Sequence, residues 1–175
     1  MQIESIEIKN YRLFRDAKLQ NIPRLCVLVG ANGTGKSTLF DVFSFLKDAL
    51  AMNVGKAMSK RGGYKELASR GFTDQPIEFT LQFRLEITGY ERLVTYILKS
   101  EPDATGRAVV AREVLRYKRG ANGKPFHFLD FAYGQGYAIT NEEDFSKVDE
   151  ALVREEQALD APDILAVKGL GQFDR

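Results

Sequence analysis

Eight consecutive residues carry the clearest chemical pattern in this sequence, Gly30-Ala31-Asn32-Gly33-Thr34-Gly35-Lys36-Ser37. They match G-x-x-x-x-G-K-[ST], the Walker A phosphate loop, at every fixed position. Glycines let successive backbone N–H groups point into one concavity, where they hold the closely spaced oxygens of a polyphosphate. The helix that follows adds free N–H donors and a partial positive charge at its N-terminus. The pattern therefore predicts binding of a nucleoside triphosphate.

Three side chains at the end of this loop have expected roles of their own. Lys36 places an ammonium group between the β- and γ-phosphates, and Ser37 supplies a hydroxyl ligand to Mg²⁺. Thr38 is placed to bond the α-phosphate. We therefore predict that ATP and Mg²⁺ are the cofactors, bound by Gly30, Ala31, Asn32, Gly33, Thr34, Gly35, Lys36, Ser37 and Thr38. A glycine turn beside an exposed lysine is the alternative, but it does not explain why all the fixed residues coincide.

The segments on either side of the loop fit this interpretation. Residues 24–29, RLCVLV, form a short apolar run before a glycine, which predicts a parallel strand buried on both faces with Cys26 as a packing residue. From Lys36 onward apolar residues recur every three or four positions, which predicts a helix. Its stripe is Leu39, Phe40, Val42, Phe43, Leu46 and Leu50. We expect Phe40, Phe43 and Phe45 to be core residues rather than a ligand box.

The rest of the chain divides into four segments after residues 1–52, which hold a first strand at 2–9, the loop and its helix. Glycines and Pro76 break the periodicity of residues 53–76, which predicts a long loop or a loop with short helical pieces. Residues 77–139 alternate apolar and polar side chains between turns, including Asn122-Gly123, and predict an antiparallel sheet. Residues 141–160 are expected to form a helix that Pro162 ends, and residues 161–175 a junction.

Composition points to one globular domain in the cytoplasm. The chain has 175 residues, of which 44% are hydrophobic and 28% are charged, and Cys26 is its one cysteine. A single cysteine excludes an internal disulfide and fits a reducing compartment. The N-terminus lacks the pattern of a signal peptide, and no run of 18 apolar residues predicts a membrane span.

The charges are unevenly distributed along the chain, although the net charge is only +1. Residues 1–140 hold 21 basic and 14 acidic side chains, whereas residues 141–163 hold 2 and 9. The acidic stretch is interpreted as a solvated helix face, with a partner surface as the alternative. Five basic residues cluster between 53 and 76: Lys56, Lys60, Arg61, Lys65 and Arg70. DNA phosphates could bind there, but aromatic residues are sparse, so we favour a solvated loop.

Residues 8–14, IKNYRLF, and residues 28–39, LVGANGTGKSTL, resemble the opening of ABC-type ATPases of the SMC/Rad50/RecF kind. The likeness is greatest to the predicted AAA-type ATPases of bacteria that group with the OLD-family nucleases. It implies an α/β P-loop NTPase head whose first lobe joins an antiparallel sheet to the Walker A strand and helix. It also implies a homodimer in which ATP lies between two heads.

The resemblance adds two site residues. It implies that Arg12 lies near the nucleotide phosphates, with a surface salt bridge as an equally weighted alternative. It implies a glutamine at the lobe junction that touches Mg²⁺ and the attacking water, for which Gln172 is the best candidate. Gln82, inside a strand, suits that role less well. The expected catalytic residues are therefore Lys36 and Gln172, and the expected Mg²⁺ ligands are Ser37 and Gln172.

The sequence departs from that family's pattern in its later motifs. The 175 residues contain no LSGG-like signature, no apolar run ending in Asp-Glu and no switch histidine, since His127 lies in a hairpin strand and is interpreted as structural. We therefore expect half of a head: a truncated chain, a proteolytic fragment or one piece of a split protein. Alone, it should bind ATP weakly and hydrolyse it poorly.

These observations favour an ATPase head that acts in DNA maintenance or phage defence, with hydrolysis and head dimerisation depending on the missing half. The alternative is a nucleotide-dependent scaffold that binds a partner without turnover. A small kinase or GTPase is disfavoured because no acceptor or base-reading motif is visible. Contact with DNA is an open expectation.

Overall fold

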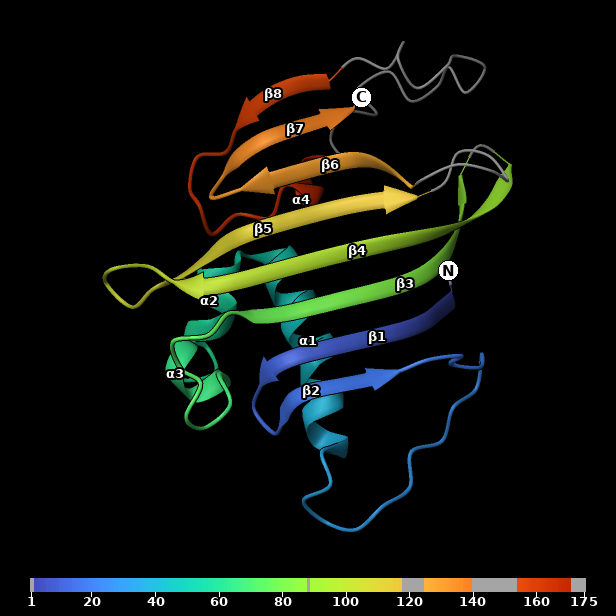
Figure 1. The fold of residues 1–175 in the computed structure, drawn as a ribbon, viewed down its shortest axis with the longest axis vertical. Coiled ribbons are helices and arrows are strands. Elements are labelled where there is room, and N and C mark those ends of the chain that lie inside the picture. Colours follow the sequence, from blue (N-terminus) through green and yellow to red (C-terminus); the bar gives the residue numbers. More distant parts are fainter. Residues whose placement is uncertain (1, 88, 118–124, 140–153, 171–175) are drawn as a thin grey trace.

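The computed structural model describes residues 2–87, 89–117, 125–139 and 154–170 (Figure 1). Its strands are β1 (Gln2–Tyr11), β2 (Phe14–Leu19), β3 (Ile77–Ile87), β4 (Tyr90–Pro102), β5 (Ala108–Tyr117), β6 (Phe126–Ala132), β7 (Gln135–Ile139) and β8 (Arg154–Ala158). Its helices are α1 (Lys36–Ala51), α2 (Val54–Ser59), α3 (Tyr64–Leu67) and α4 (Val167–Leu170). None of the described helices is both long and apolar enough to cross a membrane.

All eight described strands form one antiparallel sheet in the order β2-β1-β3-β4-β5-β6-β7-β8. Its register follows the alternation of the sequence, since Ile8 pairs with Phe79 and Phe79 with Leu98. All three side chains are buried on the same face. The predicted antiparallel region at residues 77–139 is confirmed, and the strand predicted at residues 2–9 extends to Tyr11. Asn122-Gly123 lies outside the described residues.

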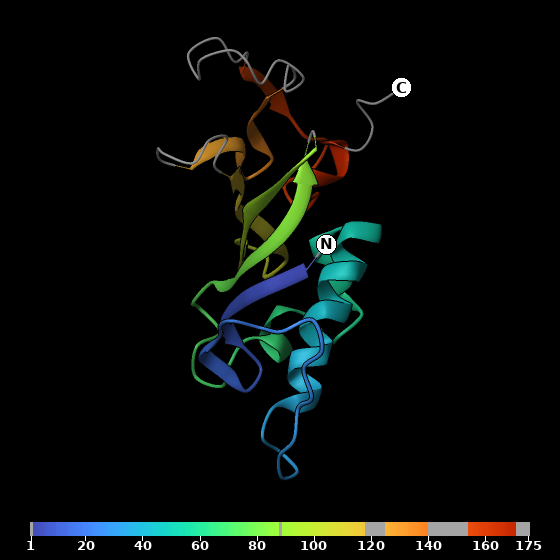
Figure 2. The same cartoon turned by 90° about the vertical axis from the view of Figure 1, so that its right-hand side faces the viewer.

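Helices cover one face of this sheet, as the view along its edge shows (Figure 2). Apolar residues of α1 and α2 pack against β1, β3 and β4 in the main core. Tyr11, Phe45 and Phe79 meet there with ring centroids 5.3–5.9 Å apart. Such contacts add to the burial of the rings and fix α1 on the sheet. The predicted helix after the loop and the predicted short helices in residues 53–76 are confirmed.

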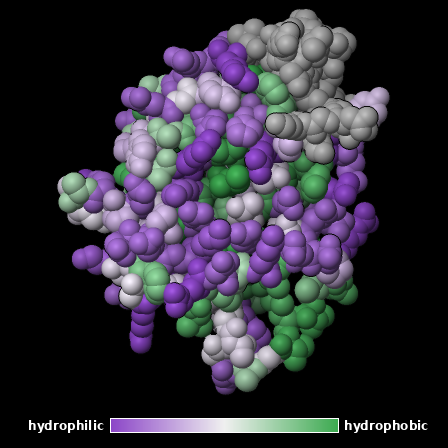
Figure 3. Space-filling view, viewed as in Figure 1, coloured by the Kyte–Doolittle hydropathy of each residue, from purple (hydrophilic) through white to green (hydrophobic). Residues whose placement is uncertain are grey.

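The strand predicted at residues 24–29 is wrong for this structure. These residues form an irregular connection between β2 and α1, and Leu25, Val27 and Val29 are 82%, 76% and 91% exposed. Cys26, expected to be buried, is also exposed. A doubly buried strand needs a partner strand on each edge and an apolar layer on each face, and no described strand lies beside this segment. The lower right of Figure 3 accordingly shows hydrophobic side chains where Figure 1 draws this connection.

Two expectations about α1 also need correction. Phe40 is 64% exposed and Leu50 is 45% exposed, whereas Phe45 is fully buried and Phe43 is partly buried. Only one face of α1 meets the sheet, so apolar side chains on its outer face remain in solvent. The apolar stripe predicted a helix correctly, but it is wider than the surface that this sheet covers.

The helix predicted at residues 141–160 is contradicted where the structure describes it. Residues 154–158 form strand β8, which pairs with β7 from Arg154 opposite Ile139 to Ala158 opposite Gln135. Residues 140–153 lie outside the described part of the chain. Pairing with β7 overrides the helical preference of this polar segment, and charged side chains are typical of an edge strand.

A buried carboxylate ties the C-terminal segment to the sheet. Glu113 of β5 is fully buried and accepts hydrogen bonds from the backbone N–H groups of Ala166 at 2.5 Å and Val167 at 3.2 Å. The hydroxyl of Tyr96 donates a third bond of 2.9 Å. Burial raises the pKa of Glu113, and the three donors only partly offset this effect. The start of α4 is therefore fixed by one side chain.

Glu113→Gln is expected to destabilise the fold by about 1–3 kcal/mol, because its amide group would face the Ala166 N–H that now meets an oxygen. Because the native pKa is raised, native Glu113 takes up a proton more readily than it does in the unfolded chain. Wild-type stability relative to Glu113→Gln should therefore increase as pH falls from neutral towards 4.5 and decrease as pH rises through the native pKa. Urea unfolding at several pH values measures both effects, with Glu78→Ala as a surface control.

Candidate functional site

The loop of residues 30–37 forms an open turn that leads directly into α1. Gly33 and Gly35 adopt positive φ angles of 82° and 96°, and Gly35 is the residue that precedes the helix. L-residues with a side chain disfavour this left-handed region, so the glycines are needed for this backbone path. The residues from Gly30 to Thr34 are exposed, and no core side chain seals the loop. An anion therefore has access to the amide groups of the turn.

The side chain of Lys36 folds back into the loop. Its Nζ donates to the carbonyl oxygens of Gly30 and Ala31, both at 2.6 Å, and to the hydroxyl of Thr34 at 3.3 Å. The Thr34 hydroxyl in turn donates to the Ala31 carbonyl at 2.9 Å. An ammonium group held by neutral oxygens keeps its full positive charge, so it can exchange them for stronger anionic acceptors.

The first turn of α1 offers further polar groups. Ser37 is exposed at the start of the helix, and Thr38 in the same turn is largely buried. No acidic residue occupies this first turn, so the positive end of the helix dipole is not compensated there. The structure thus brings Gly30, Lys36, Ser37 and Thr38 together at one helix N-terminus.

A phenylalanine supports the loop from beneath. A Cβ atom added at Gly35 would lie 2.8 Å and 3.0 Å from two ring carbons of Phe14, at the start of β2. One at Gly33 would meet nothing within 4 Å. Gly35 is therefore required both for its backbone angle and for its contact with the ring. An apolar cavity of about 340 Å³ lies beside this contact, lined in part by Ile8, Leu28 and Leu39.

Two residues with positive φ give the β1–β2 hairpin its shape. Asn10 and Arg12 adopt φ angles of 57° and 50°. The side chain of Asn10 donates to the carbonyls of Phe72 and Gln75 at 2.9 Å and 2.7 Å and accepts from the N–H of Ser69 at 3.0 Å. This one buried amide therefore fastens the end of β1 to the segment that follows α3.

The tip of the hairpin is joined to α1 by a carboxylate. Asp41 accepts hydrogen bonds from the Tyr11 hydroxyl at 2.8 Å and from Arg61 Nε at 3.0 Å, and it forms an ion pair with Arg12, whose Nε lies 2.8 Å away. Burial alone would raise the pKa of Asp41, but the bonds from Tyr11 and Arg61 and the charges of both arginines outweigh it and lower the pKa. Asp41, in the second turn of α1, is therefore an ionised carboxylate held in place by these three partners.

Two basic residues from the loop at 53–76 form ion pairs with carboxylates of α1. Arg61 is only 8% exposed and also pairs with Asp48 at 2.7 Å, while Lys60 pairs with Asp48 at 3.3 Å. Arg61 is therefore not available as a free DNA-binding cation of the alternative hypothesis, whereas Lys60 has a side chain that is 63% exposed and forms a surface ion pair. Lys56, Lys65 and Arg70 are exposed.

A groove of about 720 Å³ runs beside the first turn of α1. Arg12, Arg15, Lys65 and Arg70 line it together with Thr38 and the acidic Glu66. The guanidinium of Arg15 also lies 4.0 Å above the ring of Phe72, which lines a neighbouring pocket rather than this groove. Four basic side chains against one acidic side chain make this groove attractive to anions.

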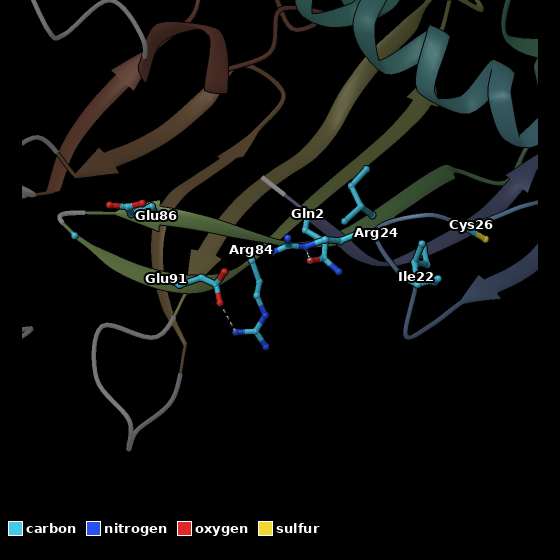
Figure 4. A pocket seen from close by; sticks show the side chains of 10 residues that line it. Gln2, Ile22, Arg24, Cys26, Arg84, Glu86 and Glu91 are labelled. Atoms are coloured by element: carbon cyan, nitrogen blue, oxygen red, sulfur yellow. Dashed lines mark hydrogen bonds and ion pairs between the residues drawn. The ribbon is translucent and has the colours of Figure 1, made fainter.

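A cavity of about 960 Å³ lies elsewhere and has weaker chemistry. It is formed by the start of β1, the β3–β4 hairpin and the connection after β2, and no residue of the loop at 30–37 lines it. Figure 4 shows Arg84 directed towards Glu91, with which it pairs at 3.4 Å, and Arg24 towards Gln2. These polar groups already pair with one another, so the size of the cavity does not make it a better candidate for the nucleotide site than the loop at 30–37.

The remaining predicted residues have mixed outcomes. Arg12 forms the salt bridge that was its alternative role, and its approach to a phosphate stays a prediction. Gln172 lies outside the described residues. His127 interacts with Asp130 at 3.2 Å in β6, and Gln82 accepts from Ser5 at 2.9 Å in β3, which supports structural roles for both.

Sequence reasoning did not single out Asp41, Phe14 or Asn10. Asp41 lay between apolar positions of the predicted helix, and Asn10 and Phe14 were part of the motif that carries the family resemblance. One signal was present, because Asn tolerates positive φ better than other side-chain-bearing residues and lies here at a strand end. The partners of Asp41 could be found only from tertiary structure.

Comparison with known proteins assigns most of this chain to a family. The model of the AAA ATPase domain matches residues 1–160, and this family implies a P-loop NTPase fold. The DNA replication and repair protein RecF of Lactococcus lactis subsp. cremoris (strain MG1363) is 26% identical over 147 residues, which cover 79% of this chain and 40% of that protein.

The RecF protein of strain SK11 is 25% identical over 150 residues, with the same shares covered. The chain thus spans about 40% of the length of these curated relatives. Because the family model covers all but the last 15 of its 175 residues, this chain belongs to the AAA ATPase domain family.

Proposed function

We propose that residues 30–38 bind the phosphates of ATP together with Mg²⁺, and that residues 1–175 are the N-terminal part of an ATPase head. The observation that carries this proposal is the open glycine loop at the start of α1, in which the Lys36 ammonium is held only by neutral oxygens. Family membership supports the same assignment.

Each residue has a distinct role in this proposal. The amides of Gly33 and Gly35 point at the phosphates, and Lys36 leaves its carbonyl partners to bind the β- and γ-phosphates. Ser37 ligates Mg²⁺, which supplies electrostatic stabilisation of the charge that develops on the phosphates. Thr38 binds the α-phosphate at the edge of the basic groove, with Arg12 beside it. Gln172 would complete the metal site and orient water.

A further polypeptide segment completes the head in our proposal. Residues 24–29 expose alternate apolar side chains and make no backbone hydrogen bonds to other described residues. An unpaired extended segment of this kind is a template for strand addition, which would bury its side chains and pair its backbone. The curated relatives are much longer than this chain, so they contain sequence that could supply such a strand.

The wider role that we propose is ATP hydrolysis coupled to dimerisation of two heads in the cytoplasm, in DNA maintenance or phage defence. The similarity to proteins named for DNA replication and repair supports the DNA-related process. A scaffold that dimerises without turnover is the second candidate, favoured by the lack of an apolar run ending in Asp-Glu in these residues. Joining this chain to a longer relative's C-terminal part distinguishes them, since only an ATPase gains turnover.

Lys36→Ala tests the proposed binding site. Removing the ammonium should weaken MgATP binding at least tenfold, because a charged hydrogen bond contributes about 1.5–3 kcal/mol. Isothermal titration calorimetry measures the affinity. Lys47→Ala is the matched control, since Lys47 is an exposed lysine on the same helix and should leave the affinity unchanged. Equal affinity of the two variants for MgATP would contradict the assignment.

A further inference from the structure

We propose that Asp41 is a positioning residue, which aims the terminal nitrogens of Arg12 at the phosphate bound beside Thr38. This inference rests on the proposed function and adds to it a residue that does not itself touch the nucleotide. It follows from the ion pair between Asp41 and Arg12 and from the place of the Arg12 side chain in the same groove as Thr38.

The shortest contact between the two side chains joins Nε of Arg12 to Oδ2 of Asp41, at 2.8 Å. Arg12 forms no ion pair with any other described residue, so its guanidinium can still meet a further anionic acceptor. The Arg12 side chain is 39% exposed and lines the same basic groove as Thr38. A phosphate at that turn can therefore be bound by the guanidinium while Asp41 holds Nε.

The backbone of Arg12 limits where its side chain can point. Its φ is 50°, and its N–H donates to the carbonyl of Leu67 at 2.6 Å. Tyr11, one residue earlier, is fully buried and also bonds to Asp41. The start of the arginine side chain is thus fixed by the hairpin, and its Nε is fixed by the carboxylate. Little conformational freedom remains to be lost when an anion binds.

The carboxylate is itself held from the other side. Arg61 donates to Oδ1 of Asp41 at 3.0 Å and is anchored by Asp48 and by the hydroxyl of Ser44 at 2.9 Å. Asp41 therefore cannot turn to follow Arg12, and two arginines balance its negative charge near a polyphosphate. These contacts distinguish a rigid support from an incidental surface ion pair, whose contribution is typically small.

The charge of Asp41 must be separated from its positioning effect. Removing a negative charge close to the phosphates would strengthen ATP binding by itself, whichever residue replaces Asp41. Asp41→Asn and Asp41→Ala lose the same charge, but asparagine retains an oxygen that can accept from Arg12 Nε and alanine does not. The ratio of the MgATP affinities of these two variants therefore measures the positioning effect without the effect of charge.

The experiment is a calorimetric titration with MgATP of both variants, in the wild-type chain and in Arg12→Ala. We expect Asp41→Ala to bind about tenfold more weakly than Asp41→Asn, which corresponds to one well-aimed charged hydrogen bond. In the Arg12→Ala background the two should bind within about twofold of each other, since a residue that acts through Arg12 has nothing left to position.

A second variant keeps the test decisive if Asp41→Ala does not fold. Arg12→Lys keeps the positive charge but cannot hold Asp41 and a phosphate with separate nitrogens of one rigid group. Its affinity for MgATP should therefore fall nearly as far as that of Arg12→Ala. Retention of wild-type affinity by the lysine variant would overturn the positioning role.

The outcomes also distinguish the two proposals. The role of Asp41 would be overturned if Asp41→Ala and Asp41→Asn bound MgATP equally well in the wild-type chain. It would also be overturned if their tenfold difference in affinity persisted in the Arg12→Ala background. Neither result would contradict the phosphate loop as the ATP-binding site. If wild type does not bind MgATP, or if Lys36→Ala binds it equally well, the proposed function fails and the role of Asp41 fails with it.

Discussion

Asn10→Ala is expected to lower the free energy of unfolding by about 3–4 kcal/mol, since three hydrogen bonds of a buried side chain disappear at once. The variant would leave the Ser69 N–H without its side-chain partner and would remove one bond each to the carbonyls of Phe72 and Gln75, although the Gln75 carbonyl keeps the bond from the Tyr64 hydroxyl. It would also place alanine at a φ of 57°. Ser69 and Arg70 of the same segment line the basic groove, so loosening of the segment should also weaken the binding of an anion there.

A second asparagine in the chain provides the control for the backbone term. Asn21 has nearly the same φ, 54°, but it is exposed. Asn21→Ala should therefore cost only about 1 kcal/mol, the penalty for placing alanine in the left-handed region. Urea unfolding of both variants measures the difference. Equal losses would show that the contacts of Asn10 do not stabilise the fold.

Gly35→Ala is expected to reduce MgATP affinity at least tenfold, whereas Gly33→Ala should have a clearly smaller effect. Both glycines have positive φ, so alanine costs about 1–2 kcal/mol of backbone strain at either position. Only at Gly35 would the added Cβ also lie 2.8 Å from the ring of Phe14. To relieve that overlap the loop or the Phe14 ring must shift, and a shift of the loop would misalign the amides that we propose as phosphate ligands.

The ring of Phe14 can be removed to test this explanation. Combining Gly35→Ala with Phe14→Leu should restore part of the lost affinity, because the smaller side chain leaves room for the new methyl group. Phe14→Leu alone serves as the reference. Calorimetry with MgATP measures the affinity of wild type and of each variant. Similar losses for Gly33→Ala and Gly35→Ala, with no recovery in the double variant, would refute a steric role for the ring.

Local patterns in the sequence were sufficient for much of the fold. The alternation from Ile77 to Ile87 predicts one buried and one wetter face, and β3 shows that arrangement from Ile77 to Leu81, whereas Leu85 is 39% exposed. The recurrence of apolar residues after Lys36 similarly predicted α1. The identity and spacing of the loop residues predicted the candidate site, because its chemistry depends on a contiguous stretch of chain.

Features that depend on distant partners could not be predicted in this way. The run at residues 24–29 has the composition of a buried strand, but composition cannot specify whether neighbouring strands are present, and Val29 is 91% exposed. Residues 154–158 suit a helix locally, yet they pair with β7 as an edge strand.

The charged cluster around Asp41 was equally inaccessible to sequence reasoning. Arg61 lies 20 residues beyond Asp41, inside a group of basic residues that suggested a solvated or DNA-binding loop. The fold instead buries its guanidinium between two carboxylates of α1. Pairing of this kind depends on how α1 and the chain after α2 pack, so the sequence predicted the charges but not their partners.

The central claim is that the amides of the loop and Lys36 hold the polyphosphate of a nucleotide. Nuclear magnetic resonance can test it directly, by following the backbone amide signals of isotope-labelled protein during titration with MgATP, magnesium tripolyphosphate and adenosine. We predict that both phosphate compounds shift the amides of residues 30–38 most strongly and that adenosine leaves them nearly unchanged. Shifts concentrated elsewhere, or shifts in this loop of equal size with adenosine, would contradict the account.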